Sequence, residues 1–377
     1  MKVKVKKSEI LPALRGAFRA ISTKSPLPIL TGMKFEALEE GVLSVAGTDL
    51  EIVITCTIPA EVDEPGTAVL PAVTTIGFIE KLAEDIVIAD TDSAMLTIKS
   101  GKVEADICVF PADEYPEILS VQEEELKFVV NAKNFCDMLF RTVYAASDKD
   151  SRPQICGVNF EVGNGELVLA ATDTHRLSIG RLALEGISQQ KTVIVPKKTV
   201  EEIVKLYRDK KDDLAVVMGS NQIGFVSGNT TVVSRIIEGL FPNYRAVLPK
   251  DFITTVEIDP VVLLDTLERA KTLAINNESV MLHLRNNFIE VSLQGESCKM
   301  HETVNAEVCG NEMRICFSAR YLIEAVKNTA AGGKKVQIGF VGPLNPIMLM
   351  TADGSVISLV LPRKDRDVAK KEAQKAS

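Results

Sequence analysis

The sequence predicts an α+β fold in which one domain occurs three times along the 377-residue chain. A shift of 125 residues places Gly32–Glu36 on Gly157–Glu161 and Pro71 on Pro196. A third, weaker copy matches 195–205 to 317–327 at a shift of 122 residues. Self-similarity at a nearly fixed spacing indicates tandem repeats of one structural unit. We therefore expect three copies of a domain with two helices on one face of antiparallel sheets.

Each copy is predicted to open with a short strand and an amphipathic helix. The strands are expected at Val3–Lys6, Phe128–Val130 and Thr255–Ile258. The expected helix N-caps are Ser8, Asn131 and Asp259. Apolar residues at helical spacing predict the buried faces, which are Ile10, Leu14, Phe18 and Ile21, then Phe135, Leu139 and Val143, then Leu263, Leu267 and Ala270.

Hairpins and a second helix are predicted to complete each copy. Turn sequences typical of hairpins occur at Asn164–Gly165, Asn286–Asn287, Ser100–Gly101, Ser227–Gly228 and Asp353–Gly354. The second helices are expected to begin near Pro71, Pro196 and Ser318. We expect about eight strands per copy, with domains at 1–122, 126–250 and 253–364. The charged segment 365–377 is expected to be a disordered tail.

Composition and motifs argue against several classes of protein. No apolar run is long enough to span a membrane, and the N-terminus lacks the apolar core of a signal peptide, so we expect a cytoplasmic protein. The seven cysteines lack zinc-ligand spacing and are expected to be buried thiols. Gly332–Lys335 does not match a phosphate-binding loop. Neither a metal nor a cofactor is predicted.

A catalytic site is also not expected. Asp173 and His175 have the spacing of an acid–base pair, but no nucleophile accompanies them. Asp49 occupies the corresponding place in the first copy, so Asp173 is interpreted as a turn residue of the fold. A polymerase or nuclease would require clustered carboxylates, whereas Glu123–Glu125 falls in a predicted linker. A three-domain scaffold or adhesion protein remains an alternative.

Charge is distributed unevenly along the chain. The formal net charge is −8, yet residues 1–24 carry +6 and residues 25–125 carry −17. Basic residues recur on the predicted helices, and a channel lined by them would attract phosphates without reading bases. Three tandem copies leave two open ends that resemble the internal joints. A second identical chain would close them into a symmetric ring.

Several short motifs occur in an order that is similar to a known family. They are Leu27–Leu30, Gly47–Leu50, Ala171–Leu177, Glu238–Arg245 and Leu359–Pro362. From about residue 1 to 364 the chain resembles the bacterial β sliding clamps, the processivity subunits of DNA polymerase III. The resemblance implies three DNA-clamp domains per chain and a head-to-tail homodimeric ring around duplex DNA, in the cytoplasm and associated with the nucleoid. It also implies an accessory subunit without catalytic residues of its own.

The resemblance further implies a peptide-binding cleft between the second and third domains. Its partners would be the polymerase III alpha subunit, the clamp loader, translesion polymerases, mismatch-repair proteins and ligase, each binding through a short peptide. The implied cleft residues are Ile155, Thr172, His175, Arg176, Leu177, Pro242, Val247, Tyr321, Asn345, Pro346, Val360, Leu361, Pro362 and Arg363. His175 and Arg176 would orient polar groups of the peptide. Thr174 and Ala246 depart from some relatives, which have Gly and Arg there.

Two further sets of residues follow from the resemblance. The positions expected to contact DNA are Lys24, Lys149 and Arg152 on loops, with Arg15, Arg19, Lys197 and Lys198 on the helices. The subunit joint is expected to bring Lys271, Thr272 and Leu273 of the third domain against Asp106 and Cys108 of the first domain of another chain.

Overall fold

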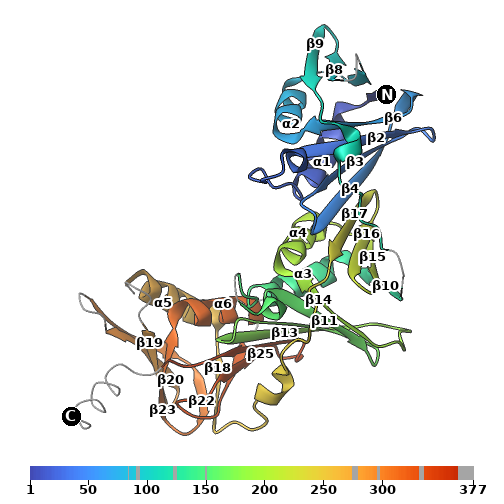
Figure 1. The fold of residues 1–377 in the computed structure, drawn as a ribbon. Coiled ribbons are helices and arrows are strands. Elements are labelled where there is room, and N and C mark those ends of the chain that lie inside the picture. Colours follow the sequence, from blue (N-terminus) through green and yellow to red (C-terminus); the bar gives the residue numbers. More distant parts are fainter. Residues whose placement is uncertain are drawn as a thin grey trace. The chain divides into compact units, whose positions relative to one another are not determined.

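The structure is a computed structural model. It describes residues 1–83, 85–90, 94–121, 125–148, 151–273, 279–294, 298–330 and 335–363. Lys149, one of the residues expected to contact DNA, lies outside the described residues, as do Glu123 and Glu124 of the predicted linker, Gly332–Lys334 and the tail 365–377. Within the described ranges the predicted order of strands and helices occurs three times, except that the short strand at Glu61–Glu64 in the first copy and Glu307–Gly310 in the third has no counterpart in the second (Figure 1).

The three copies contain the following elements. The first has β1 (Lys2–Val5), α1 (Lys7–Phe18), β2 (Gly32–Leu38), β3 (Val42–Thr48), β4 (Ile52–Pro59), β5 (Glu61–Glu64), β6 (Gly66–Pro71), α2 (Ala72–Lys81), β7 (Ile86–Asp90), β8 (Met95–Ser100) and β9 (Val103–Cys108). The second has β10 (Leu126–Asn131), α3 (Ala132–Val143), β11 (Gly157–Gly163), β12 (Glu166–Thr172), β13 (Arg176–Ala183), β14 (Lys191–Pro196), α4 (Lys197–Tyr207), β15 (Asp213–Met218), β16 (Gln222–Ser227) and β17 (Thr230–Arg235). The third has β18 (Thr254–Ile258), α5 (Pro260–Leu273), β19 (Ser279–Arg285), β20 (Phe288–Gln294), β21 (Lys299–Asn305), β22 (Glu307–Gly310), β23 (Met313–Ser318), α6 (Ala319–Thr329), β24 (Val336–Phe340), β25 (Ile347–Met350) and β26 (Val356–Val360).

Two of the three predicted helix caps are confirmed. The Asn131 carboxamide accepts from the amide of Asn134 at 3.1 Å, and the Asp259 carboxylate accepts from that of Val261 at 2.8 Å. The prediction of Ser8 is wrong, because α1 already begins at Lys7 and its N-cap, Lys6, makes no side-chain capping bond. The strand β1 ends at Val5, so only one residue separates strand and helix and Ser8 lies inside the first turn.

The chain folds as two compact units. One comprises Met1–Cys136 with Glu201–Ile236, and the other comprises Asp137–Val200 with the chain from Ile237 onward. The first unit contains a five-stranded sheet, β5-β1-β7-β8-β9, and an eight-stranded sheet, β10-β15-β16-β17-β4-β3-β2-β6. The second unit contains a nine-stranded sheet, β14-β11-β12-β13-β26-β25-β24-β18-β22, and a four-stranded sheet, β21-β20-β19-β23. In each unit a large sheet therefore runs from one copy into the next.

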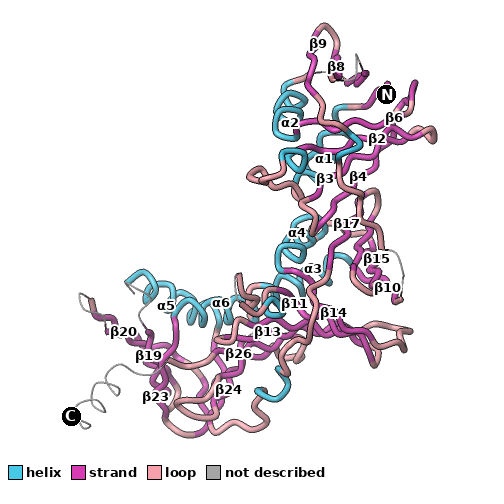
Figure 2. The backbone as a smooth tube through the Cα atoms, in the orientation of Figure 1, coloured by secondary structure: helices cyan, strands magenta, loops and turns pink. Residues whose placement is uncertain are grey.

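Helices pack on the sheets through the predicted apolar faces. In the first unit Ile10 and Leu14 of α1 are fully buried, while Phe18 is only half-buried because Ala17 takes the core position in that turn. A close approach of α1 to β3 requires Gly47, where an added Cβ would lie 2.3 Å from the Ala17 carbonyl oxygen. In the second unit α5 and α6 lie side by side, with Leu263 and Leu267 fully buried (Figure 2).

The expectation for the cysteines holds in part. Cys56, Cys136 and Cys316 are buried, whereas Cys108 and Cys309 are exposed. The two exposed thiols lie on β9 and β22, strands at the edges of their sheets, where alternate side chains face solvent.

Candidate functional site

The two segments expected to form the cleft, one from the second copy and one from the third, lie side by side in the second unit. The strands β13 and β26 pair antiparallel, with Arg176 opposite Val360 and Leu177 opposite Leu359. The pairing continues past the strand ends, where the Leu361 amide donates to the His175 carbonyl at 2.9 Å. Residues far apart in the sequence thus lie side by side, and β13, β26 and the residues at their paired ends are together called the strip.

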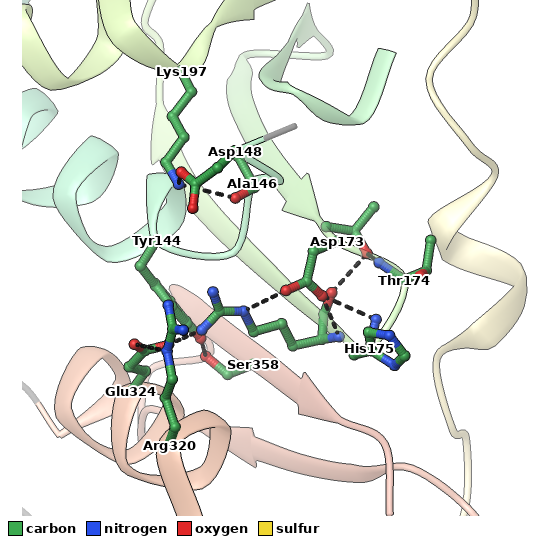
Figure 3. A network of polar contacts seen from close by, with 12 residues as sticks. Tyr144, Ala146, Asp148, Asp173, Thr174, His175, Lys197, Arg320, Glu324 and Ser358 are labelled. Atoms are coloured by element: carbon green, nitrogen blue, oxygen red, sulfur yellow. Dashed lines mark hydrogen bonds and ion pairs between the residues drawn. The ribbon is translucent and has the colours of Figure 1, made fainter. Parts of the chain in front are cut away.

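A tight turn positions His175 and Arg176 at the start of β13. The Asp173 carboxylate accepts from the amides of both residues, at 2.9 and 3.0 Å, and the Thr172 hydroxyl accepts from the amide of Thr174 at 3.1 Å (Figure 3). Thr174 has φ +73°, a left-handed conformation that glycine adopts more easily than a β-branched residue. This strain explains why glycine suits the position.

The first copy has the same turn. The Asp49 carboxylate accepts from the amides of Glu51 and Ile52, the Thr48 hydroxyl accepts from that of Leu50, and Leu50 has φ +77°. The interpretation of Asp173 as a turn residue is therefore confirmed. Arg176 is equivalent to Ile52 by this correspondence, so the second copy has a charged side chain where the first copy has an apolar one.

The guanidinium of Arg176 is nearly buried and bound on several sides. Its side chain is 6% exposed, and its Nε donates to the Asp173 carboxylate at 2.9 Å. A terminal nitrogen pairs with Glu324 of α6, whose other oxygen accepts from Arg320 at 3.1 Å (Figure 3). The guanidinium carbon also lies 4.8 Å from the ring centre of Tyr321 and 5.2 Å from that of Tyr144, distances typical of cation–π contacts.

These contacts give Arg176 a role within the protein. Its Nε and one terminal nitrogen bind two carboxylates, so it joins β13 to α6, while its expected role in orienting a peptide stays a prediction. His175 remains exposed, and its ring stacks on Tyr321 with 6.0 Å between centres. The sequence analysis missed Tyr144 and Glu324. The Tyr144 hydroxyl donates to Ser358 at 3.1 Å, and burial raises the pKa of this tyrosine.

An apolar cluster lies beneath the strip. Leu177, Tyr244, Met348 and Leu359 are buried together, with Phe241 packed against them. Among the expected cleft residues, Ile155 and Val360 are also buried and thus support the surface from below. The side chains of this set that reach solvent are those of His175, Pro242, Val247, Asn345 and Leu361, with Thr172, Tyr321, Pro346, Pro362 and Arg363 partly exposed.

Some of the expected cleft residues contact one another directly, and others lie on separate elements. Thr172, His175, Arg176, Tyr321 and Leu361 are linked by hydrogen bonds or ring contacts. Ile155 lies in the short helix η3 (Pro153–Ile155), Val247 ends η4 (Tyr244–Val247), and Ala246 is exposed beside it. Arg363 follows the end of β26 and lies beside β23, where its amide donates to the Cys316 carbonyl at 2.8 Å.

The residues expected to contact DNA differ in how far they are already engaged. Lys24 and Lys198 are exposed, and Arg152 is exposed just before η3. Arg15 pairs with Glu80 at 2.8 Å and Arg19 with Glu202 at 3.2 Å.

Lys197 is partly buried and already held within the protein. It donates to the Ala146 carbonyl at 3.1 Å and to Asp148 at 2.5 Å, and it holds the pKa of that carboxyl below its usual range (Figure 3).

The residues expected at the subunit joint are exposed. Asp106 and Cys108 lie on β9, which is the edge strand of its sheet. Lys271, Thr272 and Leu273 form the last turn of α5, where Lys271 lies 3.8 Å from Glu268.

In the described part of the chain, no helix is long and apolar enough to cross a membrane. No cluster of three or more His, Cys, Asp or Glu residues in the same ranges could hold a metal ion.

Comparison with known proteins covers almost the whole chain. Three family models of the DNA polymerase III beta subunit match it: the N-terminal domain at residues 1–120, the central domain at 129–243 and the C-terminal domain at 245–364. A beta sliding clamp from Staphylococcus aureus is 31% identical, with 96% of this chain and 99% of the relative covered.

Solved structures agree with this assignment. The DNA polymerase sliding clamp of Bacillus subtilis has a TM-score of 0.92 and 28% identity, over 97% of this chain and 99% of that one. The beta subunit of Streptococcus pyogenes has a TM-score of 0.91 and 28% identity, over 97% and 100%. The chain therefore belongs to the DNA polymerase III beta subunit family, the family of the DNA sliding clamps.

Proposed function

We propose that two copies of this chain close head to tail into a ring around duplex DNA, without catalysing a reaction. The ring would act on nucleoid DNA in the cytoplasm and tether the replicative polymerase through its alpha subunit. The clamp loader, translesion polymerases, mismatch-repair proteins and ligase would bind the same surface through short peptides. The domains would correspond to residues 1–122, 126–250 and 253–364.

One observation carries the proposal. The same kind of strand pairing joins the first copy to the second and the second copy to the third, and at each end of this series one strand of that kind lies at a sheet edge. In the first unit β4 of copy one pairs with β17 of copy two. In the second unit β13 of copy two pairs with β26 of copy three. The third strand after the first helix thus pairs with the last strand of the next copy.

The strands that correspond to these partners are both at sheet edges. In the third copy the equivalent of β4 and β13 is β21, and in the first copy the equivalent of β17 and β26 is β9. Both are terminal in their sheets. An exposed edge strand offers unpaired backbone groups to another chain. A second copy supplies the complementary edge at both ends, which closes a symmetric assembly.

The strip along β13 and β26 supports the peptide-binding part of the proposal. Leu361 presents exposed apolar surface, its amide donates to the carbonyl of His175, and the imidazole of His175 is exposed. Pro242 and Val247 are exposed on the segment whose Phe241 and Tyr244 pack in the cluster with Leu177. A few polar groups beside apolar side chains are typical of sites that bind short peptide segments. Leu177 lies below the surface, and we expect it to shape the strip rather than to contact the peptide.

Retention on circular DNA tests the ring. The purified chain should be a dimer at micromolar concentration and, after loading, should remain on nicked circular DNA in high salt and slide off when the DNA is linearised. A closed ring predicts this difference because topology, unlike ion pairing, is insensitive to salt. A monomer that is not retained on the circle would contradict the proposal and favour a scaffold that does not encircle DNA.

Binding of a clamp-binding peptide from the polymerase tests the strip. Leu361 is 41% exposed, and its replacement by Ala should weaken peptide binding about tenfold or more, as expected for losing a buried anchor. Val129→Ala on β10 is the matched control, since Val129 is 57% exposed and lies in the other unit. Equal affinity of the two variants, measured by calorimetry, would overturn the peptide site.

A further inference from the structure

The second helix of a copy places a glutamate at each internal joint between copies. Glu202 is the sixth residue of the 11-residue helix α4, and Glu324 is the sixth residue of α6, which is also 11 residues long. Each is bound by an arginine of the preceding copy, because Glu202 pairs with Arg19 at 3.2 Å and Glu324 pairs with Arg176. The two glutamates therefore occupy equivalent positions, and each joins its copy to the one before it.

The arginine that reaches this glutamate lies on a different element at each joint. Arg19 is the first residue after α1, and the equivalent residue after α3 is Tyr144. Arg176 is the first residue of β13, and its equivalent in β4 is the buried Ile52. At the second joint an aromatic residue thus follows the helix, and the cation lies on the strand that forms the strip.

The position of this cation on β13 connects it to His175 in two ways. The Nε of Arg176 donates to the Asp173 carboxylate, which accepts from the amide of His175 at 2.9 Å (Figure 3). The guanidinium carbon lies 4.8 Å from the ring centre of Tyr321, and that ring stacks on the imidazole of His175 with 6.0 Å between centres. Both the backbone and the ring of His175 are therefore connected to the guanidinium through one intermediate residue.

We propose that Glu324 is a positioning residue of the peptide-binding strip, and that it acts through Arg176 to set the orientation of the His175 imidazole. This inference rests on the proposed peptide site and extends it to a residue outside the expected cleft set. The charge-assisted bond to Glu324 holds the guanidinium where it contacts both Tyr321 and Asp173. Without the charge of Glu324, the guanidinium loses one of its two carboxylate partners and moves relative to the Tyr321 ring.

Burial makes the pair with Arg176 the stronger of the two pairs that Glu324 forms. The side chain of Arg176 is 6% exposed, whereas Arg320, which binds the other oxygen of Glu324 at 3.1 Å, is 59% exposed. Water and salt screen an exposed ion pair more than a nearly buried one. Removal of one partner of a buried pair leaves the other charge uncompensated. We therefore expect the loss of the Glu324 charge to act mainly on Arg176.

Peptide binding by two matched glutamine variants tests the proposal in the full chain. Glu324→Gln should weaken binding of a clamp-binding peptide from the polymerase about fivefold or more in calorimetry, because the imidazole of His175 loses its fixed orientation. Glu202→Gln is the matched control, since it removes the equivalent charge at the joint in the other unit. Its affinity for the peptide should stay within about twofold of the wild type.

Thermal unfolding and a conservative variant separate positioning from folding. Both glutamine variants should lower Tm by comparable amounts, because each breaks an ion pair between two copies. Glu324→Asp keeps the charge on a side chain that is one methylene shorter, and it should bind the peptide more tightly than Glu324→Gln. Equal losses of peptide affinity in Glu324→Gln and Glu202→Gln would overturn the proposal, because a general loss of stability at the joints would then explain them.

A double-mutant cycle with His175 tests the route. His175→Ala should itself weaken peptide binding, and in that background Glu324→Gln should change the affinity by less than about twofold, because the group that it positions is gone. Equal effects of Glu324→Gln with and without the imidazole would overturn the proposal.

The outcomes separate this inference from the peptide site. A wild-type chain that does not bind the peptide overturns the site and the positioning role together. Peptide binding that depends on Leu361 but not on Glu324 overturns the positioning role alone.

Discussion

At the level of single residues, Arg176 carries a charge into a nearly buried position and is held there by Asp173 and Glu324. Lysine keeps the charge but lacks the planar fork that serves two carboxylates. We expect Arg176→Lys to lower the free energy of unfolding by about 1–3 kcal/mol, because it leaves a partly buried carboxylate without its bond. Urea unfolding measures the loss.

Arg181→Lys is the control on the same strand. Arg181 is 40% exposed and lies 3.4 Å from Glu166, so its replacement should cost less than about 1 kcal/mol. If the two variants lose the same free energy of unfolding, the inference that Arg176 holds β13 to α6 is wrong.

At the level of elements, Gly47 allows α1 to cross β3 closely. An added Cβ would lie 2.3 Å from the backbone carbonyl of Ala17, which no rotamer change can relieve. Gly47→Ala should therefore lower the free energy of unfolding by about 1–3 kcal/mol, the usual cost of overpacking. Gly77 on α2 is the matched control, because nothing lies within 4 Å of its added Cβ.

Gly77→Ala should instead stabilise the helix by about 0.5–1 kcal/mol, since alanine suits a helix interior better than glycine. Thermal unfolding of both variants compares the two effects. A neutral Gly47→Ala would mean that α1 moves away from β3 without loss.

The contact between α5 and β21 should depend on pH. Arg269 holds the pKa of Glu302 below its ordinary value of 4.5, helped by the Thr266 hydroxyl. A carboxyl with a lowered folded-state pKa adds stability above its unfolded pKa and loses it as the pH falls through the folded value. Glu302→Gln should thus cost up to about 1 kcal/mol at neutral pH, since the pair is partly exposed, and little in acid. A cost that persists once the wild-type carboxyl is protonated would contradict this origin.

Sequence patterns predicted the repeat, the helices and the hairpins because each depends on local spacing. The turn at Asn164–Gly165 and the cap at Asp259 are examples, since neighbouring residues determine both. Local spacing could not predict the pairing of β13 with β26, because the two strands are far apart in the sequence. For the same reason the ion pair between Arg176 and Glu324 of α6 was not predicted from the sequence.

At the level of the whole molecule, the net charge is −8 although the chain has 43 lysines and arginines, so attraction to DNA depends on which of these cations are not already paired with carboxylates. Several of its helix cations are already paired, as Arg15 is with Glu80, whereas Lys24 is exposed on a loop. Each phosphate contact contributes about 0.9 to the slope of log affinity against log salt. Lys24→Ala should lower that slope by about this amount, and Arg15→Ala by less, because Glu80 already compensates its charge.

Fluorescence anisotropy with a short linear duplex, titrated at several salt concentrations, measures both slopes without any contribution from topology. A larger decrease for Arg15→Ala than for Lys24→Ala would show that DNA displaces Glu80 and that the ion pair does not withhold Arg15 from phosphate. Retention on nicked circular DNA should be the same for both variants, because a closed ring is held by its topology and neither residue lies on β9 or β21.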